Sequence, residues 1–391
     1  MAPPKIIKAY NESEVICTYD EASNPIVPKK TLKGYAKDVL DVFLPAGYPH
    51  TVTPDYTPYQ IYDSLQAFSS TIAGLLSSRA VLQGFGVGDS ASSATAAVLL
   101  TVLQESTGRI ATILFAHRHG RAIEPECKYY RFLADIVNDS ALFLSILSPV
   151  LPPYPKTFAL CAAGALRALC GVSGGAAKAS LSAHFAKNGN LAELNAKDGS
   201  QETVISLLGM LAGSMFVQVV HGKIAVGISM VVLVIVHLWT NYQAVRSVQM
   251  RTLNRQRLTI ILEEATGPRG AILRPDQVAK KEHILTWISP SVSFGTTFPR
   301  LREISHFKNQ KYRDCSYVIV QQQDSYKIFL KQGAPTIAAL QAWAEAFTGL
   351  HWPVDSNFWK ALKAAGWDLQ TNAMEIGPSV RIVMDDENKL A

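Results

Sequence analysis

Residues 196–245 read AKDGSQETVISLLGMLAGSMFVQVVHGKIAVGISMVVLVIVHLWTNYQAV, and this stretch decides the fold. Two runs without Asp, Glu, Lys or Arg, 203–222 and 224–245, are separated by the single residue Lys223. Each run is about the length that lets a helix cross the roughly 30 Å hydrocarbon core of a bilayer. We therefore expect an antiparallel pair of membrane-spanning helices with a turn at His221-Gly222-Lys223.

A basic stretch follows this pair of runs. Arg246, Arg251, Arg255 and Arg257 occur with no acidic residue among them. Because Lys and Arg beside a span collect on the cytoplasmic side, this end of the second run is expected to face a cytoplasm-like compartment. Two core helices of a large soluble protein are the alternative. The pairing of the runs and the arginines directly behind them favour an integral membrane protein.

The composition fits one large apolar region with polar ends. The chain has 391 residues, enough for two or three domains, and is 48% hydrophobic but only 17% charged. Soluble domains usually carry about 25% charged residues. The net charge of +6 is spread thinly, with a local excess at 246–257, and a basic stretch beside a span typically meets lipid headgroups. No aromatic-interleaved basic groove is visible in the sequence, so nucleic acid is not an expected partner.

Cysteine and histidine usage gives no sign of a metal or a disulfide framework. The five cysteines form no CxxC pair. His117 and His119 have no nearby Cys or Asp, and a solvated loop is the simpler interpretation. The first residues, MAPPKIIKAYNESEV, contain neither a signal-peptide core nor an arginine-rich presequence, so internal segments are expected to direct insertion.

The pattern along the chain predicts a mainly α protein with four regions. Residues 1–45 form a polar arm with a small hairpin, and 46–262 form a multi-pass helical membrane domain. A charged linker is expected at 263–311. Residues 312–391 are predicted to form a small soluble α+β domain, because 317–321 and 327–330 have the composition of a β-hairpin and 335–347 that of an amphipathic helix.

The first helix of the membrane region is expected to have two different faces. Thr57, Pro58 and Gln60 suit an N-cap, a first helical position and a third helical position. Apolar residues then recur at helical spacing, while Asp63 and Gln66 belong to a polar stripe. Such a helix is typical of one that contacts lipid or core on one side and a polar cavity on the other.

Two glycine-rich stretches predict broken helices and a candidate internal repeat. Arg79 lies seven residues before Gly86, and Arg167 lies seven residues before Gly174. Each stretch is followed by a small-residue helix and then by a polar interruption, at 105–109 and at 197–201. A chance occurrence of two such stretches in alanine-rich helices is the alternative.

Several segments resemble a known family. They include GYPHTVTPDY at 47–56, ADIVND at 134–139, RALCGVSGGAAKASLSAHFA at 167–186 and AKDGSQET at 196–203. On these segments the chain resembles the root UVB sensitive family of eukaryotic membrane proteins, over roughly residues 42–262. The resemblance implies an integral membrane protein connected with seedling growth under UV-B and with vitamin B6 homeostasis, and it implies no particular reaction.

Two positions depart from the pattern of that family. Lys178 stands where an arginine is expected, and 105–109 read ESTGR where an Arg-Asp-Gly type of sequence is commoner. A bidentate role of that arginine cannot pass unchanged to a lysine, because an ammonium group lacks the planar fork of a guanidinium.

The sequence gives no positive support for an enzyme. Residues 84–89 do not match GxGxxG, and Ala177 rather than glycine precedes Lys178, so neither glycine-rich stretch is a nucleotide loop. The spacing shows no Ser-His-Asp or Cys-His arrangement. We therefore expect no enzyme activity, no cofactor and no metal.

The candidate site consists of polar side chains in or beside apolar segments. Charges at membrane depth cost several kcal/mol unless they are paired or face a cavity, and broken helices in two halves mark transporter sites. The candidates are Asp63, Arg79, Asp89, Arg109, Asp139, Arg167, Lys178, Lys197, Asp198, Gln201 and Glu202. Arg79 and Arg167 are expected to supply charge to an anionic group.

Structural roles are the alternative for these residues. Arg79 could pair with Asp89, and Arg167 with Asp198, only to fix helix packing. Asp198 could also be the N-cap of a helix over 203–220, with Gln201 closing a capping box.

These observations lead to two hypotheses on function. The first is a carrier of a small polar or anionic solute, for which the resemblance suggests a vitamin B6-type phosphate. The second is a non-transporting membrane scaffold or complex subunit that acts through its terminal domains. The expected partners are the lipid bilayer, the solute, and a family paralogue or a second copy of the chain.

Overall fold

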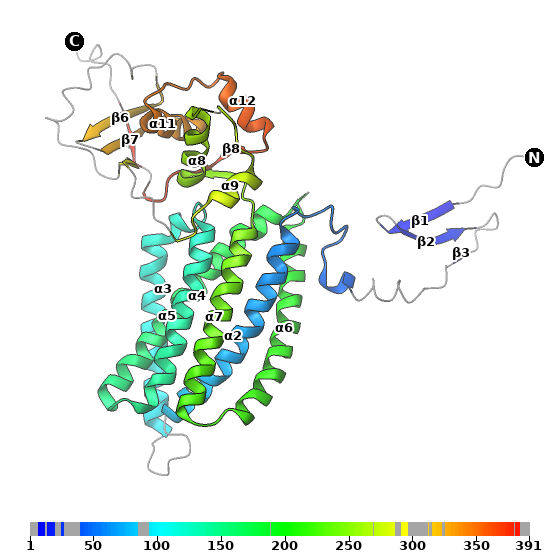
Figure 1. The fold of residues 1–391 in the computed structure, drawn as a ribbon, viewed down its shortest axis with the longest axis vertical. Helices are drawn as coiled ribbons and strands as arrows, with labels where there is room; N and C mark the ends of the chain where they lie inside the picture. Colours follow the sequence, from blue (N-terminus) through cyan, green and yellow to red (C-terminus); the bar gives the residue numbers. More distant parts are fainter. Residues whose placement is uncertain are drawn as a thin grey trace, which may run out of the picture.

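The computed structural model describes residues 7–11, 14–19, 25–26, 40–84, 94–187, 189–268, 270–285, 291–295, 312, 315–322, 325–378 and 380–383. Within these residues, long helices form a bundle, and a smaller α/β unit lies over one end of it (Figure 1). The bundle helices are α2 (Tyr56–Gly84), α3 (Ala94–Ile123), α4 (Cys127–Leu147), α5 (Pro153–Phe185), α6 (Leu191–Val219) and α7 (Lys223–Ser247).

The bundle is of the multi-pass membrane type that the sequence predicts. The helices α3 to α7 are long and apolar enough to cross a membrane. Their outer faces are apolar too, since Ile228, Val232 and Ile235 on α7 are all exposed. Exposed side chains of this kind in a continuous band suit contact with lipid. The more polar α2 packs against α6 and α7.

The predicted helical pair at 203–245 is confirmed, but its beginning differs. α6 ends at Val219, α7 begins at Lys223, and Gly222 has φ 84°, a conformation that glycine adopts without strain. α6 begins at Leu191, so Asp198 and Gln201 lie inside the helix. The expectation of a capping box at Asp198 is therefore wrong, because these side chains are held by neighbouring elements.

Three of the predicted helix breaks are also wrong. α3 continues through 105–109, α5 through 171–175 and α6 through 197–201. In an apolar bundle an uninterrupted helix satisfies its own backbone groups, which favours continuity. Gly174 lies against α4, where a Cβ added to it would make an ordinary contact of 3.4 Å with Cβ of Ala134. The stretch around Gly86 lies outside the described residues. Because the other three interruptions are continuous helix, the described residues give the candidate repeat no support.

The start of α2 differs slightly from the prediction. α2 begins at Tyr56, so Thr57 is not its N-cap. The Thr57 hydroxyl lies 2.6 Å from the hydroxyl of Tyr48 instead. The difference arises because Asp55, which precedes the helix, is bonded to α5 and to the chain after α7.

The α/β unit begins earlier than the sequence suggests. The predicted hairpin is present: β6 (Tyr317–Gln322) pairs antiparallel with β7 (Ser325–Lys331), and β5 (Val292–Phe294) and β9 (Arg381–Ile382) pair with β7. β4 (Thr252–Asn254) pairs in parallel with β8 (Asp368–Ala373). The helices are α8 (Arg255–Thr266), α9 (Pro275–Lys281), α11 (Thr336–Thr348) and α12 (Asn357–Ala364).

One apolar core joins the early and late parts of this unit. Leu258 and Ile261 of α8 belong to the same buried cluster as Trp343 and Trp359. The predicted boundary at 262 therefore falls inside α8, and the region expected to be a linker contains α9 and β5.

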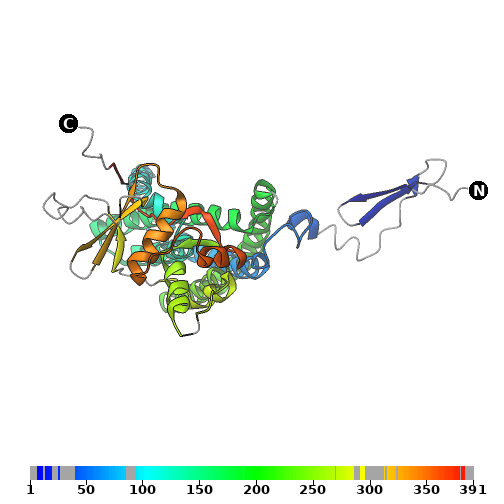
Figure 2. The ribbon, with the colours of Figure 1, turned by 90° about the horizontal axis from the view of Figure 1, so that it is seen from above.

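The N-terminal hairpin is also present. β1 (Ile7–Asn11) pairs antiparallel with β2 (Glu14–Tyr19), which pairs with β3 (Pro25–Ile26). Figure 2 shows this sheet to one side of the bundle, and the α/β unit over the helix ends.

Buried ion pairs hold the α/β unit on the bundle. Lys128 of α4 donates to Glu282, and Arg257 Nε of α8 donates to Glu282 Oε1 at 2.6 Å. All three side chains are almost completely buried. Burial alone would raise the pKa of Glu282, but the charges of Arg257 and Lys128 hold this pKa below its ordinary value.

Candidate functional site

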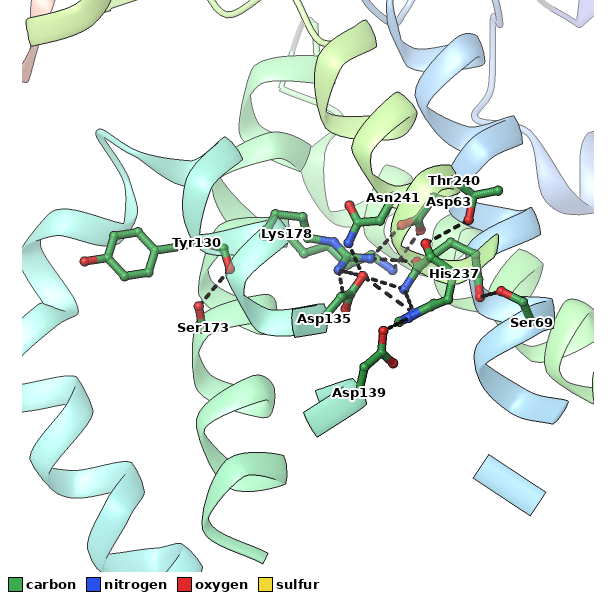
Figure 3. A network of polar contacts seen from close by, with 12 residues as sticks. Asp63, Ser69, Tyr130, Asp135, Asp139, Ser173, Lys178, His237, Thr240 and Asn241 are labelled. Carbon is green, nitrogen blue, oxygen red and sulfur yellow. Dashed lines mark hydrogen bonds and ion pairs between the residues drawn. The ribbon is translucent and has the colours of Figure 1, made fainter. Parts of the chain in front are cut away.

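A cluster of charged and amide side chains lies between the helices of the bundle (Figure 3). We call it the polar cluster. It draws side chains from α2, α4, α5, α6 and α7. Its members are Gln60, Asp63, Gln66, Arg131, Asp135, Asp139, Lys178, Asp198, Glu202, His237 and Asn241.

Arg131 is the centre of the inner half of the polar cluster. Its Nη2 donates to Asp63 Oδ1 at 2.8 Å and to Gln66 Oε1 at 2.9 Å. Its Nη1 lies 3.1 Å from both carboxylate oxygens of Asp135. The planar guanidinium therefore joins α4 to α2 with several donors at once, which a lysine could not do.

His237 connects α7 to the same group. Its Nδ1 lies 2.8 Å from Asp139 Oδ2, and its Nε2 lies 2.8 Å from Gln66 Nε2. A tautomer with the proton on Nδ1 donates to Asp139 and accepts from Gln66, which satisfies both ring nitrogens. One turn further along α7, Asn241 donates to Asp135.

Lys178 is the centre of the outer half. Its Nζ lies 2.8 Å from Asp198 Oδ2, 2.9 Å from Glu202 Oε2 and 4.0 Å from Asp63 Oδ2. Gln60 Nε2 donates to Asp198 Oδ1 at 2.5 Å. Lys178 is 26% exposed and Glu202 57%, whereas Asp63 is 10% exposed. Asp63 thus links a buried inner half to an outer half that reaches the surface of the bundle.

Two buried oxygens of the polar cluster have no partner among the described residues. They are Asp139 Oδ1 and Asn241 Oδ1. An unsatisfied buried acceptor costs about 1–3 kcal/mol. Both oxygens can accept a hydrogen bond from a water molecule or a solute, and the Asp139 carboxylate can also bind a proton.

The charge of the polar cluster is unbalanced. Four of its five carboxylates pair with the permanent cations Arg131 and Lys178, and the fifth, Asp139, lies beside His237, which is charged only when protonated. Uncompensated carboxylates are expensive away from water. The cluster is therefore chemically suited to take up protons or a positively charged group. Among the described residues, no three His, Cys, Asp or Glu side chains are placed to hold a metal ion.

The structure brings five of the predicted site residues together: Asp63, Asp139, Lys178, Asp198 and Glu202. Arg79 lies elsewhere, with Nη1 3.3 Å from the carbonyl oxygens of Val217 and Val220 at the end of α6. Asp89, its suggested partner, lies outside the described residues.

Arg167 is also separate from the polar cluster. Its Nη2 donates to Ser145 Oγ at 2.5 Å. The suggested pair of Arg167 with Asp198 is therefore wrong, because Lys178 is the cation beside that carboxylate. Arg109 is exposed on α3, away from the polar cluster.

Lys197 and Gln201 contact a different part of the chain from Asp198 and Glu202. Lys197 Nζ donates to the carbonyls of Asp41 and Val42 at 2.5 and 3.2 Å. Gln201 Nε2 donates to the carbonyl of Phe43 at 2.6 Å. One face of this helical turn therefore holds the segment before α2, and the next face binds Lys178.

Sequence reasoning did not identify Arg131 and His237 as site residues. A signal was present, because Arg131, Asp135 and Asp139 recur every four residues and so share one face of an apolar helix. His237 and Asn241 have the same spacing in the most apolar run of the chain.

An apolar groove of about 600 Å³, open to the outside of the bundle at the exposed Ile61 and Leu65, adjoins the polar cluster. Its walls include Leu44, Ile61, Phe68 and Ile205. Gln60 lines this groove and also donates to Asp198. The Gln60 side chain therefore lies between an apolar space and the charged side chains.

Comparison with known proteins points to one family. The family described as "Vitamin B6 photo-protection and homoeostasis domain" matches residues 29–266. "RUS family member 1" of Dictyostelium discoideum is 36% identical over 283 residues, which are 72% of this chain and 54% of that protein. "Protein root UVB sensitive 3" of Arabidopsis thaliana is 35% identical over 250 residues, which are 63% of this chain and 56% of that protein.

The family match includes the whole bundle and every member of the polar cluster. The chain spans about half the length of the curated relatives it matches. No solved structure matches the chain. With more than half of its residues matched, the chain belongs to the root UVB sensitive family, whose common region is described as a vitamin B6 photo-protection and homoeostasis domain.

Proposed function

We propose that this chain lies in a membrane and carries a small polar solute across it, with the polar cluster exchanging the solute for protons. The observation that carries the proposal is the cluster of five carboxylates, four of which pair with Arg131 or Lys178, while the fifth, Asp139, lies beside His237. Ionisable groups at such depth are typical of solute and proton pathways. The unpartnered oxygens of Asp139 and Asn241 add acceptors for a donor that arrives with the solute.

The charge of the polar cluster favours a solute with a protonated nitrogen. Arg79 and Arg167, which were expected to bind an anion, are bonded elsewhere. A phosphate ester would meet an excess of carboxylates, whereas an ammonium or pyridinium group would pair with them. Because the family description names vitamin B6, we propose a B6 vitamer without phosphate, such as pyridoxamine.

The groove beside Gln60 offers room for such a molecule. Its volume of about 600 Å³ lies within the range of roughly 300–1,000 Å³ that is usual for small-molecule sites. In this scheme the aromatic ring enters an apolar space, and its charged group approaches Asp198. Rearrangement of Gln60 would then connect the two, without any catalysed reaction.

Uptake into proteoliposomes tests the proposal. We expect saturable uptake of labelled pyridoxamine that depends on a pH gradient, and little uptake of pyridoxal phosphate. Asp139→Asn removes the carboxylate that His237 contacts, so uptake should fall roughly tenfold or more, the loss of about one good charged interaction. Lys197→Gln is the matched control, because Lys197 bonds outside the polar cluster and its loss should leave uptake near the wild-type level.

Two results would contradict the carrier proposal: equal uptake by Asp139→Asn and wild type, or no gradient-dependent uptake of either compound. A folded Asp139→Asn protein, judged by its melting temperature, is required for the comparison.

A membrane scaffold is the second candidate. The observation that favours it is the mutual satisfaction of most polar-cluster atoms, which a purely structural network also requires. For a scaffold we expect no uptake by wild type, and loss of a stoichiometric partner when residues after 252 are deleted.

A further inference from the structure

We propose that two copies of this chain associate side by side in the membrane through α3. This helix lies at the edge of the bundle, where it packs mainly against α5 (Figure 1). The contact with α5 is close, because a Cβ added at Gly164 would lie 2.5 Å from Gln104 Cγ. The side of α3 that faces away from α5 has no covering element among the described residues.

This uncovered side is broad and mostly apolar, and one exposed stripe on it carries two opposite charges. The residues of this stripe recur at spacings of three and four, so they lie one above another on the helix. They are Val98, Val102, Glu105, Arg109 and Ile113, and all are exposed. The stripe is apolar at both ends and carries one acid and one base between them.

The two charges lie at the depth where charge is most expensive. α3 spans 94–123, so Glu105 and Arg109 lie around its midpoint. Exposed apolar side chains precede them at Val98 and follow them at Ile113. A charged side chain at the bilayer centre costs several kcal/mol unless it is paired. Neither side chain has a hydrogen bond or ion pair within the described part of the chain.

A second copy supplies the missing partners in the right order. A two-fold axis along the membrane normal places the two α3 helices at equal height, and a two-fold interface repeats each contact. Glu105 and Arg109 are one turn apart, about 6 Å along the axis. Each Glu105 can therefore pair with Arg109 of the second copy, while the valines and Ile113 form an apolar seam around the charges.

This interface is independent of the solute that the polar cluster binds. Its residues lie on the face of α3 away from the bundle interior, and α3 contributes no side chain to the polar cluster. Failure of the carrier proposal would leave the interface prediction intact, and the reverse is also true.

Charge reversal with two differently tagged copies tests the interface. In nanodiscs, one wild-type tag should capture the other. Glu105→Arg should abolish self-association, because the introduced guanidinium would meet Arg109 of the second copy, and Arg109→Glu should abolish it for the same reason with two acids. When the two variants are expressed together, each new charge faces its opposite, so capture should return. In each single variant, replacing attraction by repulsion is expected to lower the association constant between two copies roughly a hundredfold.

Arg118→Glu is the matched control, because Arg118 is exposed on α3 but lies near the end of the helix. We expect it to retain association. Recovery in the mixed pair also guards against misfolding, since only folded copies can restore capture. The proposal is overturned if wild type is a single copy per nanodisc, if both single variants still self-associate, or if the mixed pair does not associate. Capture of a different membrane protein in place of a second copy also overturns it.

Discussion

Arg131 shows how one side chain can hold a polar network inside an apolar bundle. Its guanidinium contacts Asp63, Gln66 and Asp135, all of which are buried. A buried cation is tolerated when several acceptors surround it, and removal of one member leaves the others uncompensated. The effect on stability is therefore expected to exceed that of any surface charge in this protein.

We predict that Arg131→Met lowers the free energy of unfolding by about 3–5 kcal/mol, because Asp63 and Asp135 remain buried without their cation. The melting temperature in detergent measures this effect. Arg118→Met, which removes an exposed arginine from the neighbouring helix, is the control and should change the melting temperature little. Equal shifts of the melting temperature in the two variants would show that Arg131 does not stabilise the protein more than an exposed arginine does.

At the scale of elements, the packing of α6 on α2 depends on two glycines one turn apart. A Cβ at Gly209 would lie 2.8 Å from Thr71 Cβ, and a Cβ at Gly213 would lie 2.6 Å from Leu75 Cδ1. Small residues at this spacing let two membrane helices approach closely. This contact positions Asp198 and Glu202 of α6 beside the residues that α2 contributes to the polar cluster.

We predict that Gly209→Val destabilises the protein by about 1–3 kcal/mol, since the larger side chain must push α6 away from α2. Gly227→Ala on α7 is the matched control, because nothing lies within 4 Å of a Cβ there. An alanine at that position should be neutral or stabilising by about 0.5–1 kcal/mol. The melting temperatures of both variants measure these effects. A Gly209→Val protein as stable as wild type would disprove the close packing of α6 on α2.

The same scale shows what could be predicted from the sequence. Apolar runs such as 224–245 exceed the length of a bilayer crossing, so the existence of these helices follows from composition. The glycines at 171–175 suggested a break, but α5 continues through them, because a helix in an apolar bundle satisfies its own backbone groups. The spacing of Arg131, Asp135 and Asp139 fixes a common face, but only the fold shows that this face meets α2 and α7.

At the scale of the whole molecule, Asp55 joins three parts of the chain. Its Oδ2 accepts from His184 Nε2 at 2.9 Å and from the backbone N–H of Gln249 at 2.6 Å. The start of α2, the end of α5 and the segment after α7 therefore meet at one carboxylate. Burial tends to raise the pKa of Asp55, but the hydrogen bond and charge of His184 and the N–H of Gln249 lower it to about 2.

The lowered pKa of Asp55 makes the stability of this junction depend on pH in acid. In the unfolded chain the pKa of Asp55 is 3.8, and in the folded protein it is about 2. The ionised carboxylate therefore contributes about 2 kcal/mol above pH 4, and this contribution is lost as the pH falls from 4 to 2. We predict that wild type melts at a higher temperature than Asp55→Asn at pH 6 and that the difference disappears near pH 2. A constant difference over this range would contradict the prediction.

The turn of α6 at AKDGSQET has a mechanical consequence. Lys197 and Gln201 donate hydrogen bonds to carbonyls of residues 41–43. Asp198 and Glu202 form ion pairs with Lys178, so both sets of contacts come from the same stretch of helix. Under the carrier proposal, a solute that displaces Lys178 from Asp198 would change the force on this turn. The hydrogen bonds of Lys197 and Gln201 would pass this force on to the segment before α2. The position of residues 41–43 is therefore expected to change with what occupies the interior of the bundle, and this change could be measured at the bundle surface.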